Sequence, residues 1–403
     1  MMAAGRAAEL GARVILLEKN EILGKKLLIS GGGRCNFTNA GADTRTFLSK
    51  LKGNDKFLFS PFAQMNIEQT ISFFNKQGLV TKVEAGGRVF PANDKAQSVL
   101  EVLISYMKQG RVTVRTKCPV RALVSDKNSI SKIKLPHNTS VIAREIIIAT
   151  GGASHPETGS TGDGFAWLAS LGHTIKKPDA SLVPIAIRDT WVKTLQGVTL
   201  PDVKMNIFQD GKKRFSRNGS ILFTHFGMSG PTVINMSKDV GDLLRYAPVT
   251  IKLDLFPGND HGTMNEKLKT LFTKEQNKKL KNVVDALTPV AKLRRTIIAL
   301  SKIDPETFCR SITREQRIGL VALLKGLPMC VKGILGKDKA IVTSGGVPLT
   351  EIDTKTMRSK ICNNAFLTGD ILDIDRPSGG YSLQLCWTTG YVAGTAAYNT
   401  LKK

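Results

Sequence analysis

The first 18 residues of the chain constrain its fold more than any other segment. Residues 1–11, MMAAGRAAELG, have the small side chains of a closely packed helix, and residues 12–17, ARVILL, predict a buried strand that ends at Glu18. This order matches the second half of a βαβ nucleotide-binding unit, in which the terminal acid binds ribose hydroxyls. The first half, an apolar strand with a GxGxxG turn, does not precede it in this sequence. We therefore expect the natural protein to begin further upstream, with Met1 inside the first helix.

Length and composition favour a cytoplasmic protein of more than one domain. A chain of 403 residues exceeds what one hydrophobic core usually supports. It holds no apolar run near the roughly 20 residues of a membrane helix, and no signal-peptide pattern. The six cysteines lie far apart without a CxxC, which argues against a zinc cluster and fits unpaired thiols in a reducing compartment. We expect no metal site.

The net charge of +25 has two explanations. Lysine is used freely on solvated faces, or the chain meets an anionic partner such as RNA, DNA or an acidic membrane surface. Residues 261–340 hold 17 Lys and Arg against 7 Asp and Glu, an excess of ten positive charges. Aromatic residues are scarce there, so the stacking platforms of single-strand binders are missing. We favour the first explanation and keep nucleic acid open; the oligomeric state stays open as well.

The residue pattern changes twice along the chain. It is mixed α/β to about 184, with a helix over 65–77 and a second helix that Asn93 or Asp94 caps. Short alternating segments follow, then helical periodicity. We predict an α/β domain from 1–184 plus 344–403, a β-rich substrate-side module from 185–260 plus 335–343, and a helical insert over 261–334.

Three consecutive glycines in 30-SGGGRCN-36 predict a close approach of a ligand to the main chain. Glycine costs conformational entropy, so a compact domain tolerates such a run where the backbone must be reached. Arg34 and Lys26 are suited to neutralising phosphate, and Asn36 can donate and accept hydrogen bonds. A flexible loop is the alternative. Cys35 lacks the nearby second cysteine of a redox pair, and we interpret it as a small buried residue.

Two later segments end apolar strands in glycine and acid. IIIATGG (146–152) runs into two glycines, and Asp163 lies between Gly162 and Gly164 before a small-residue helix. Near the C-terminus, FLTGD (366–370) leads to Gly379-Gly380 and another helix. A helix N-terminus offers free N–H groups and partial positive charge, which would stabilise the pyrimidine edge of a reduced flavin. For Asp163 the alternative is an ordinary N-cap.

Together these segments resemble the bacterial NAD(P)- and FAD-dependent oxidoreductase family of the aminoacetone-oxidase and bile-acid 3-oxo-Δ4-reductase type. The matching stretches follow one another along nearly the whole chain: AAELGARVILLEKN, GKKLLISGGGRCNFTN, GRVFPANDKA, IIIATGGASHPETGSTGDG, LFTHFGMSGP, VTSGGV and TGDILDIDRPSGGYSLQLCWTTGYVAG.

The resemblance implies an α/β fold, namely a two-dinucleotide-type, Rossmann-like FAD-binding domain with an inserted β-barrel-like module and a small helical insert. FAD is the implied cofactor, and a small molecule the implied substrate. The resemblance places FAD contacts at Glu18, Lys19, Lys26, Gly31, Gly32, Gly33, Arg34, Asn36, Val120 (through its main chain), Thr150, Gly151, Asp163, Gly369, Asp370, Gly380, Tyr381, Ser382, Leu383 and Gln384.

Three residues outside these motifs are candidates for catalysis. His225 in LFTHFGMSGP and His155 after ATGG could polarise a carbonyl or donate a proton. Arg88 in GRVFP could anchor a carboxylate or carbonyl oxygen. A structural histidine and a surface ion pair are the respective alternatives.

Two reactions compete. In the first, NAD(P)H reduces the flavin, which then reduces an activated C=C bond or a carbonyl-conjugated substrate. In the second, the flavin oxidises a small amine such as aminoacetone. The sequence has no second GxGxxG, so NAD(P)H would reach the flavin as a transient donor through the substrate cleft. A nucleic-acid-associated flavoprotein is the third hypothesis.

Overall fold

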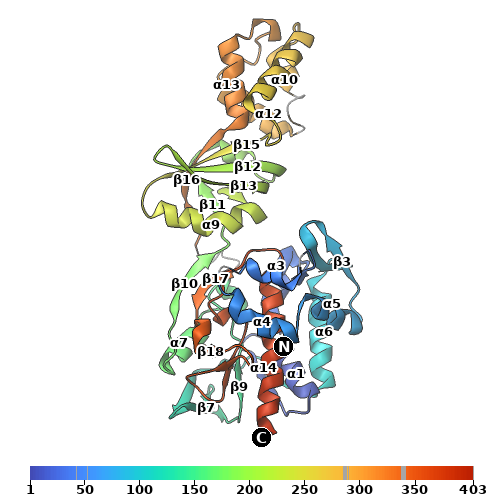
Figure 1. Cartoon of the computed structure of the whole chain (residues 1–403), viewed down its shortest axis with the longest axis vertical. Helices are drawn as coiled ribbons and strands as arrows, with labels where there is room; N and C mark the ends of the chain where they lie inside the picture. The colour runs from blue at the N-terminus through green and yellow to red at the C-terminus, as the bar shows by residue number, and fades with distance from the viewer. Residues whose placement is uncertain (42, 52, 285–287, 289, 337–341, 403) are drawn as a thin grey trace. The chain divides into compact units, whose positions relative to one another are not determined.

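The computed structural model describes residues 1–402 except 42, 52, 285–287, 289 and 337–341. The chain forms two compact units (Figure 1). Unit 1 comprises Met1–Ser181 and Lys337–Lys403, and unit 2 comprises Leu182–Gly336. Among the residues described, no helix is both long and apolar enough to cross a membrane.

Unit 1 contains two pairs of parallel strands. Strand β1 (Ile15–Leu17) pairs with β5 (Thr113–Arg115), and β9 (Ile146–Ile148) pairs with β20 (Ala365–Leu367). The second pair continues through β19 (Arg358–Ser359) into β18 (Ile352–Asp353). Within the described part of the chain no strand pairing joins the two groups. The predicted strands at 12–17, 111–115 and 144–150 therefore form, each with a shorter hydrogen-bonded span.

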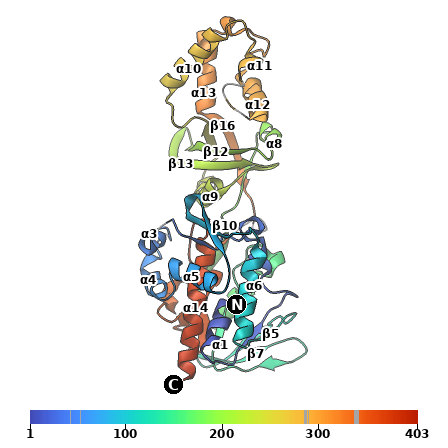
Figure 2. The same ribbon diagram turned by 90° about the vertical axis from the view of Figure 1, so that its right-hand side faces the viewer.

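Small residues allow three helices of unit 1 to pack closely. Helix α1 (Met2–Glu9) lies beside α14 (Tyr381–Leu401) and α6 (Ala96–Gln109) in both views (Figure 1, Figure 2). A Cβ atom on Gly394 would lie 2.5 Å from the Ala3 carbonyl oxygen, and one on Gly5 would lie 2.3 Å from the Tyr106 ring. Both contacts are shorter than real Cβ atoms show, so glycine permits these helix crossings.

The cap predicted for α6 is wrong. Lys95 precedes the helix and no side chain caps it. The Asn93 side chain instead accepts a hydrogen bond from the Lys95 N–H. The Asp94 carboxylate accepts hydrogen bonds from Arg34 and Lys82. The predicted helix over 65–77 is α5 (Ile67–Lys76), which begins with a capping box between Asn66 and Gln69.

Within the residues described, unit 1 contains twelve further α-helices and strands. They are α2 (Lys25–Ile29), β2 (Thr38–Asn39), α3 (Thr44–Ser49), α4 (Asp55–Gln64), β3 (Thr81–Glu84), β4 (Arg88–Pro91), β6 (Ala122–Asp126), β7 (Ser129–Lys134), β8 (Ser140–Val141), α7 (Asp163–Ser170), β10 (Lys176–Ser181) and β17 (Val342–Gly346).

Unit 2 is built on a closed antiparallel barrel. Inward residues alternate with outward ones along its strands; in β12 the buried set includes Val203, Met205 and Ile207. In barrel order the strands are β11 (Ile185–Ile187), β14 (Gly227–Ser229), β13 (Lys212–Phe223), β12 (Thr199–Gln209), β15 (Val249–Asp254) and β16 (Leu327–Ile334).

Helices complete the core of unit 2. They are α8 (Trp191–Thr194), α9 (Pro231–Leu244), α10 (His261–Lys274), α11 (Leu280–Val283), α12 (Ala291–Ser301) and α13 (Arg314–Lys325). One hydrophobic cluster runs from barrel residues such as Ile251 to helical residues such as Leu324. The predicted separation of a β-rich module from a helical insert therefore stays a prediction.

Candidate cofactor site

The three-glycine loop has a conformation that favours glycine. Gly31, Gly32 and Gly33 have φ of 57°, 68° and 85°, in the left-handed region. Gly32 has open space where a Cβ would lie, whereas a Cβ on Gly31 would lie 2.7 Å from the Asn36 main-chain nitrogen. All three glycines are exposed, so their main chain is accessible to a ligand.

Lys26 connects the helix before this loop to the segment that follows β9. Its Nζ donates to the Ser154 carbonyl oxygen at 3.0 Å and to the Ser154 Oγ at 2.7 Å. Burial lowers the pKa of Lys26. The serine contacts were not predicted, because a hydroxyl 128 residues away gives no local signal.

Thr150 and Gly151 stand at the end of the β9 segment. The Thr150 Oγ1 atom is buried without a hydrogen-bond partner among the described residues. A Cβ on Gly164 would lie 2.2 Å from that oxygen, so Gly164 leaves the room beside it. Gly151 has a φ of 73°. An unsatisfied buried hydroxyl is costly in a folded chain and indicates a missing partner.

The segment after β1 lies next to other predicted contacts. Glu18 accepts a hydrogen bond from the Asn20 N–H at 2.8 Å, and its carbonyl oxygen accepts from the Cys118 N–H at 2.9 Å. Val120 therefore lies on a segment next to Glu18. The Lys19 Nζ donates to the Asp163 Oδ2 at 2.8 Å.

Asp370 follows β20 and is held by an arginine that the sequence analysis did not select. Its Oδ1 accepts a hydrogen bond from Arg376 Nη2, and Arg376 Nε donates to Ser382 Oγ at 3.0 Å. The preceding Gly369 has a φ of 77°, and its N–H donates to Thr389 Oγ1 at 3.1 Å.

The start of α14 packs tightly against β2. A Cβ on Gly380 would lie 2.3 Å from the Thr38 carbonyl oxygen, which explains the glycine. In the amide orientation that satisfies its neighbours, Asn36 accepts from the Gly380 N–H at 3.1 Å. Tyr381 is buried and stacks on Phe47, with ring centroids 4.3 Å apart.

Two further predicted contacts in α14 face protein. Gln384 is fully buried, and its amide bonds to Thr38, Thr70 and Thr388. Leu383 is half-buried against the third hydrophobic cluster. Hydrogen bonds therefore explain the position of Gln384, and hydrophobic packing explains that of Leu383. Their contact with the cofactor stays a prediction.

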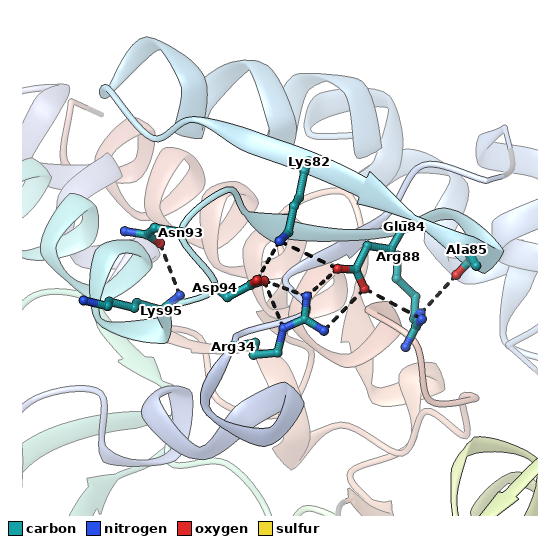
Figure 3. A network of polar contacts seen from close by, with 8 residues as sticks. All are labelled: Arg34, Lys82, Glu84, Ala85, Arg88, Asn93, Asp94 and Lys95. Atoms are coloured by element: carbon teal, nitrogen blue, oxygen red, sulfur yellow. Dashed lines mark hydrogen bonds and ion pairs between the residues drawn. The ribbon is translucent and has the colours of Figure 1, made fainter. Parts of the chain in front are cut away.

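Arg34 lies in a network of charges (Figure 3). Its guanidinium lies between the carboxylates of Glu84 and Asp94, donating to both, and it also lies 4.2 Å from the centre of the Phe90 ring. Lys82 adds a 2.6 Å contact to Asp94. Arg34, which was predicted to neutralise a phosphate, is thus bound to two carboxylates of the chain.

Each of the three catalytic candidates has its own neighbours. Arg88 belongs to the Figure 3 network, with its Nε donating to the Ala85 carbonyl oxygen at 3.0 Å. His155 has a φ of 51°, and its Nδ1 lies 2.7 Å from Glu157 Oε1. His225 is exposed in unit 2, edge-to-face with Phe226. Among the described residues no group of three or more His, Cys, Asp or Glu is arranged for a metal ion.

The fold and the family together define an FAD-dependent oxidoreductase with a Rossmann-like FAD-binding domain, as the sequence predicted. The chain belongs to the family described as "HI0933-like protein Rossmann domain", which matches residues 1–396.

Two relatives are similar over almost their whole length. The 3-dehydro-bile acid delta(4,6)-reductase of Clostridium scindens is 29% identical over 96% of this chain and 93% of its own. The ribosomal RNA dihydrouridine synthase of Escherichia coli is 28% identical over 97% of this chain and 93% of its own.

Solved structures of the same fold include two steroid enzymes. The 3-ketosteroid-delta4-(5alpha)-dehydrogenase of Rhodococcus jostii aligns with a TM-score of 0.53 at 14% identity, over 98% of this chain and 94% of its own. The 3-ketosteroid delta1-dehydrogenase of Sterolibacterium denitrificans aligns with a TM-score of 0.54 at 11% identity, over 99% of this chain and 97% of its own.

The residues present fit FAD. The open main chain of the glycine loop and the Lys26 ammonium suit a diphosphate. The orphaned Thr150 hydroxyl supplies a hydrogen-bonding group with no protein partner among the residues described. Gly151 and Gly369 have left-handed φ values at the ends of the two parallel strand segments.

Proposed function

We propose that the chain is an FAD-dependent reductase that uses NAD(P)H to reduce a C=C bond conjugated to a carbonyl. One observation carries this proposal: the chain matches two relatives over nearly their full length, and both names describe the reduction of a C=C bond. A bile-acid delta(4,6)-reductase acts on double bonds by its name, and a dihydrouridine differs from a uridine by reduction of the ring C=C bond beside a carbonyl.

Distinct residues would hold the parts of FAD. The glycine loop and Lys26 would take the diphosphate, Glu18 the adenosine ribose, and Thr150 and Asp370 the ribityl chain. Each of these groups belongs to unit 1. When bound, FAD supplies two-electron hydride transfer.

The chain's own side chains must polarise the carbonyl and supply a proton. His155 follows the β9 segment and Arg88 stands in β4 of the same unit, so we assign the polarising and protonating roles to these two. His225 is the remaining proton donor to test. Substituting each histidine by Gln and Arg88 by Met should lower the rate of substrate reduction while leaving FAD content unchanged.

Anaerobic half-reactions test the proposal. The FAD-loaded protein is mixed with NADPH, NADH or aminoacetone, and the flavin absorbance is followed. Bleaching by a nicotinamide, followed by recovery when a conjugated enone is added, is the expected result. Bleaching by aminoacetone alone would replace the proposal with amine oxidation.

A second candidate is reduction of uracil within RNA, which the charge of unit 2 favours. Lys212, Lys213 and Arg214 are exposed at the β12–β13 hairpin, and Lys267 and Lys274 are exposed on α10. Such cations bind phosphates independently of sequence. Incubation with NADPH and unmodified ribosomal RNA should then produce dihydrouridine. RNA binding that weakens steeply with salt would accompany it, and absence of both would exclude this candidate.

A further inference from the structure

Arg376 is a buried cation that connects two predicted cofactor-contact segments. Its side chain is 1% exposed, and that of Asp370 is 13% exposed. Its three nitrogens are all used: Nη2 donates to Asp370 Oδ1, Nη1 donates to the Ile374 carbonyl oxygen at 2.7 Å, and Nε donates to Ser382 Oγ at 3.0 Å. Asp370 lies three residues after the end of β20, and Ser382 lies in the first turn of α14.

The charges around Arg376 do not balance. Asp370 is its one carboxylate partner among the ion pairs of the described residues. Lys26 experiences the charges of both Asp370 and Arg376, and within the same described part of the chain it has no carboxylate at ion-pair distance. Among these three side chains two are cationic and one is anionic; Arg376 is buried and Lys26 is half-buried.

Neighbouring groups do not remove this excess. Burial raises the pKa of the Cys386 thiol to about 12, so that it stays neutral at pH 7. Glu157 also acts on Lys26, but its side chain is 61% exposed and solvent screens it. A buried, uncompensated cation is costly unless an anion is bound beside it.

We infer that Arg376 is a positioning residue for FAD: it fixes the Asp370 carboxylate against the first turn of α14, so that the half-buried Lys26 ammonium is left for the cofactor's diphosphate. This inference rests on the proposed FAD site. Arginine suits the role because its planar fork holds several acceptors at once, whereas lysine offers a single point charge.

FAD titrations of four variants test the inference. R376M should raise the Kd for FAD by about 100-fold, because it removes one buried charge and leaves Asp370 unpaired. R376K keeps the charge without the fork and should recover about tenfold of that loss. S382A removes only the Nε contact and should shift the absorption maximum of bound FAD with a smaller change in Kd. The salt dependence of the Kd should become shallower in R376M alone.

R358M is the matched control. Arg358 also bonds a carboxylate and a hydroxyl in unit 1, Glu145 and Thr400, and lies over the Phe366 ring. R358M should lower the urea midpoint without changing the Kd for FAD.

Each outcome is decisive. If wild type binds FAD and R376M binds it equally well, the inference fails and the proposed function stands. If wild type does not bind FAD, both fail. Should R376M be too unstable to purify, R376K and S382A decide: both must change FAD binding or its spectrum, and unchanged values for either one would overturn the inference.

Discussion

The Lys19 ammonium lies 2.8 Å from the Asp163 carboxylate, although 144 residues separate them. The contact joins the end of β1 to the start of α7, two of the segments in which cofactor contacts are predicted. Burial alone would raise the pKa of Asp163, but hydrogen bonds from Lys19 and Thr161 outweigh it and the pKa is lowered.

K19Q should therefore distinguish the contribution of Lys19 to stability from its contribution to FAD binding. The pair is partly solvated, so its loss should cost less than about 1 kcal/mol of unfolding free energy. If Lys19 also contacts FAD, the Kd for FAD should rise about tenfold. Urea unfolding and FAD fluorescence titration measure the two effects. K117Q, which breaks the exposed pair with Glu21, is the control and should change neither. An unchanged Kd in K19Q would remove Lys19 from the site.

The ion pairs of Arg34 should make the stability of the folded chain depend on pH in the acidic range. Hydrogen bonding from Arg34 lowers the pKa of Glu84, and hydrogen bonds from Lys82 and then Arg34 lower that of Asp94. Groups with a lower pKa in the folded chain stabilise it above their ordinary value, 4.5 for Glu84, and this stabilisation is lost as the pH falls through the folded pKa.

R34M should thus be less stable than wild type at pH 7, with the difference shrinking below pH 4.5. Thermal unfolding across pH 3–7 measures it. R144M, at an exposed arginine of the same unit, should show no such trend. A stability difference for R34M that does not vary with pH would contradict the assignment of these ion pairs.

Local chemistry explains how much of this could be predicted from sequence. The glycine loop, the helix after Gly380 and the β9 strand follow from residue preferences within a few positions. The partners of Arg34 do not, because Glu84 and Asp94 lie 50 and 60 residues further along. One of these carboxylates, Asp94, was also a predicted cap for α6, and it does not cap the helix because it binds Arg34 and Lys82 instead.

Arg376 was missed for a related reason. In DIDRPSGG it reads as an arginine in a polar turn, and only the folded chain shows that its side chain is buried between Asp370 and Ser382. The family resemblance implied the unit 2 barrel, but residue patterns alone did not predict its closure, because β11 pairs with β16 near the opposite end of the unit.

Breaking the buried ion pair between Lys325 and Asp254 should strongly destabilise unit 2. The side chains are 5% and 9% exposed and 2.6 Å apart, joining the end of α13 to the end of β15. D254A leaves a buried ammonium and should cost about 3–5 kcal/mol. The double variant K325M/D254L should recover most of that loss. Trp191 fluorescence reports on unit 2 when Trp167 and Trp387 are replaced by Phe.

The control breaks an exposed ion pair of the same unit. Lys278 and Glu275 lie 2.7 Å apart on the surface, and E275A should leave the unfolding curve unchanged. Equal effects of D254A and E275A would contradict the importance of burial.

Two helical glycines should respond in opposite directions to alanine. A Cβ on Gly394 meets the Ala3 carbonyl oxygen at 2.5 Å, so G394A should destabilise unit 1 by about 1–3 kcal/mol. Gly319 in α13 has no atom within 4 Å of such a Cβ, so G319A should stabilise unit 2 by about 0.5–1 kcal/mol. Urea unfolding followed through Trp387 and Trp191 respectively distinguishes them. Stabilisation by G394A would contradict the close packing of α1 on α14.

Equilibrium dialysis against FAD tests the central claim most directly. The folded protein, with its secondary structure verified by circular dichroism, is dialysed against excess FAD and its bound flavin is counted. We expect one FAD per chain, with a Kd that K26Q raises because the half-buried Lys26 ammonium would bind the diphosphate. A folded chain that retains no flavin, or binds it equally well after K26Q, would contradict it.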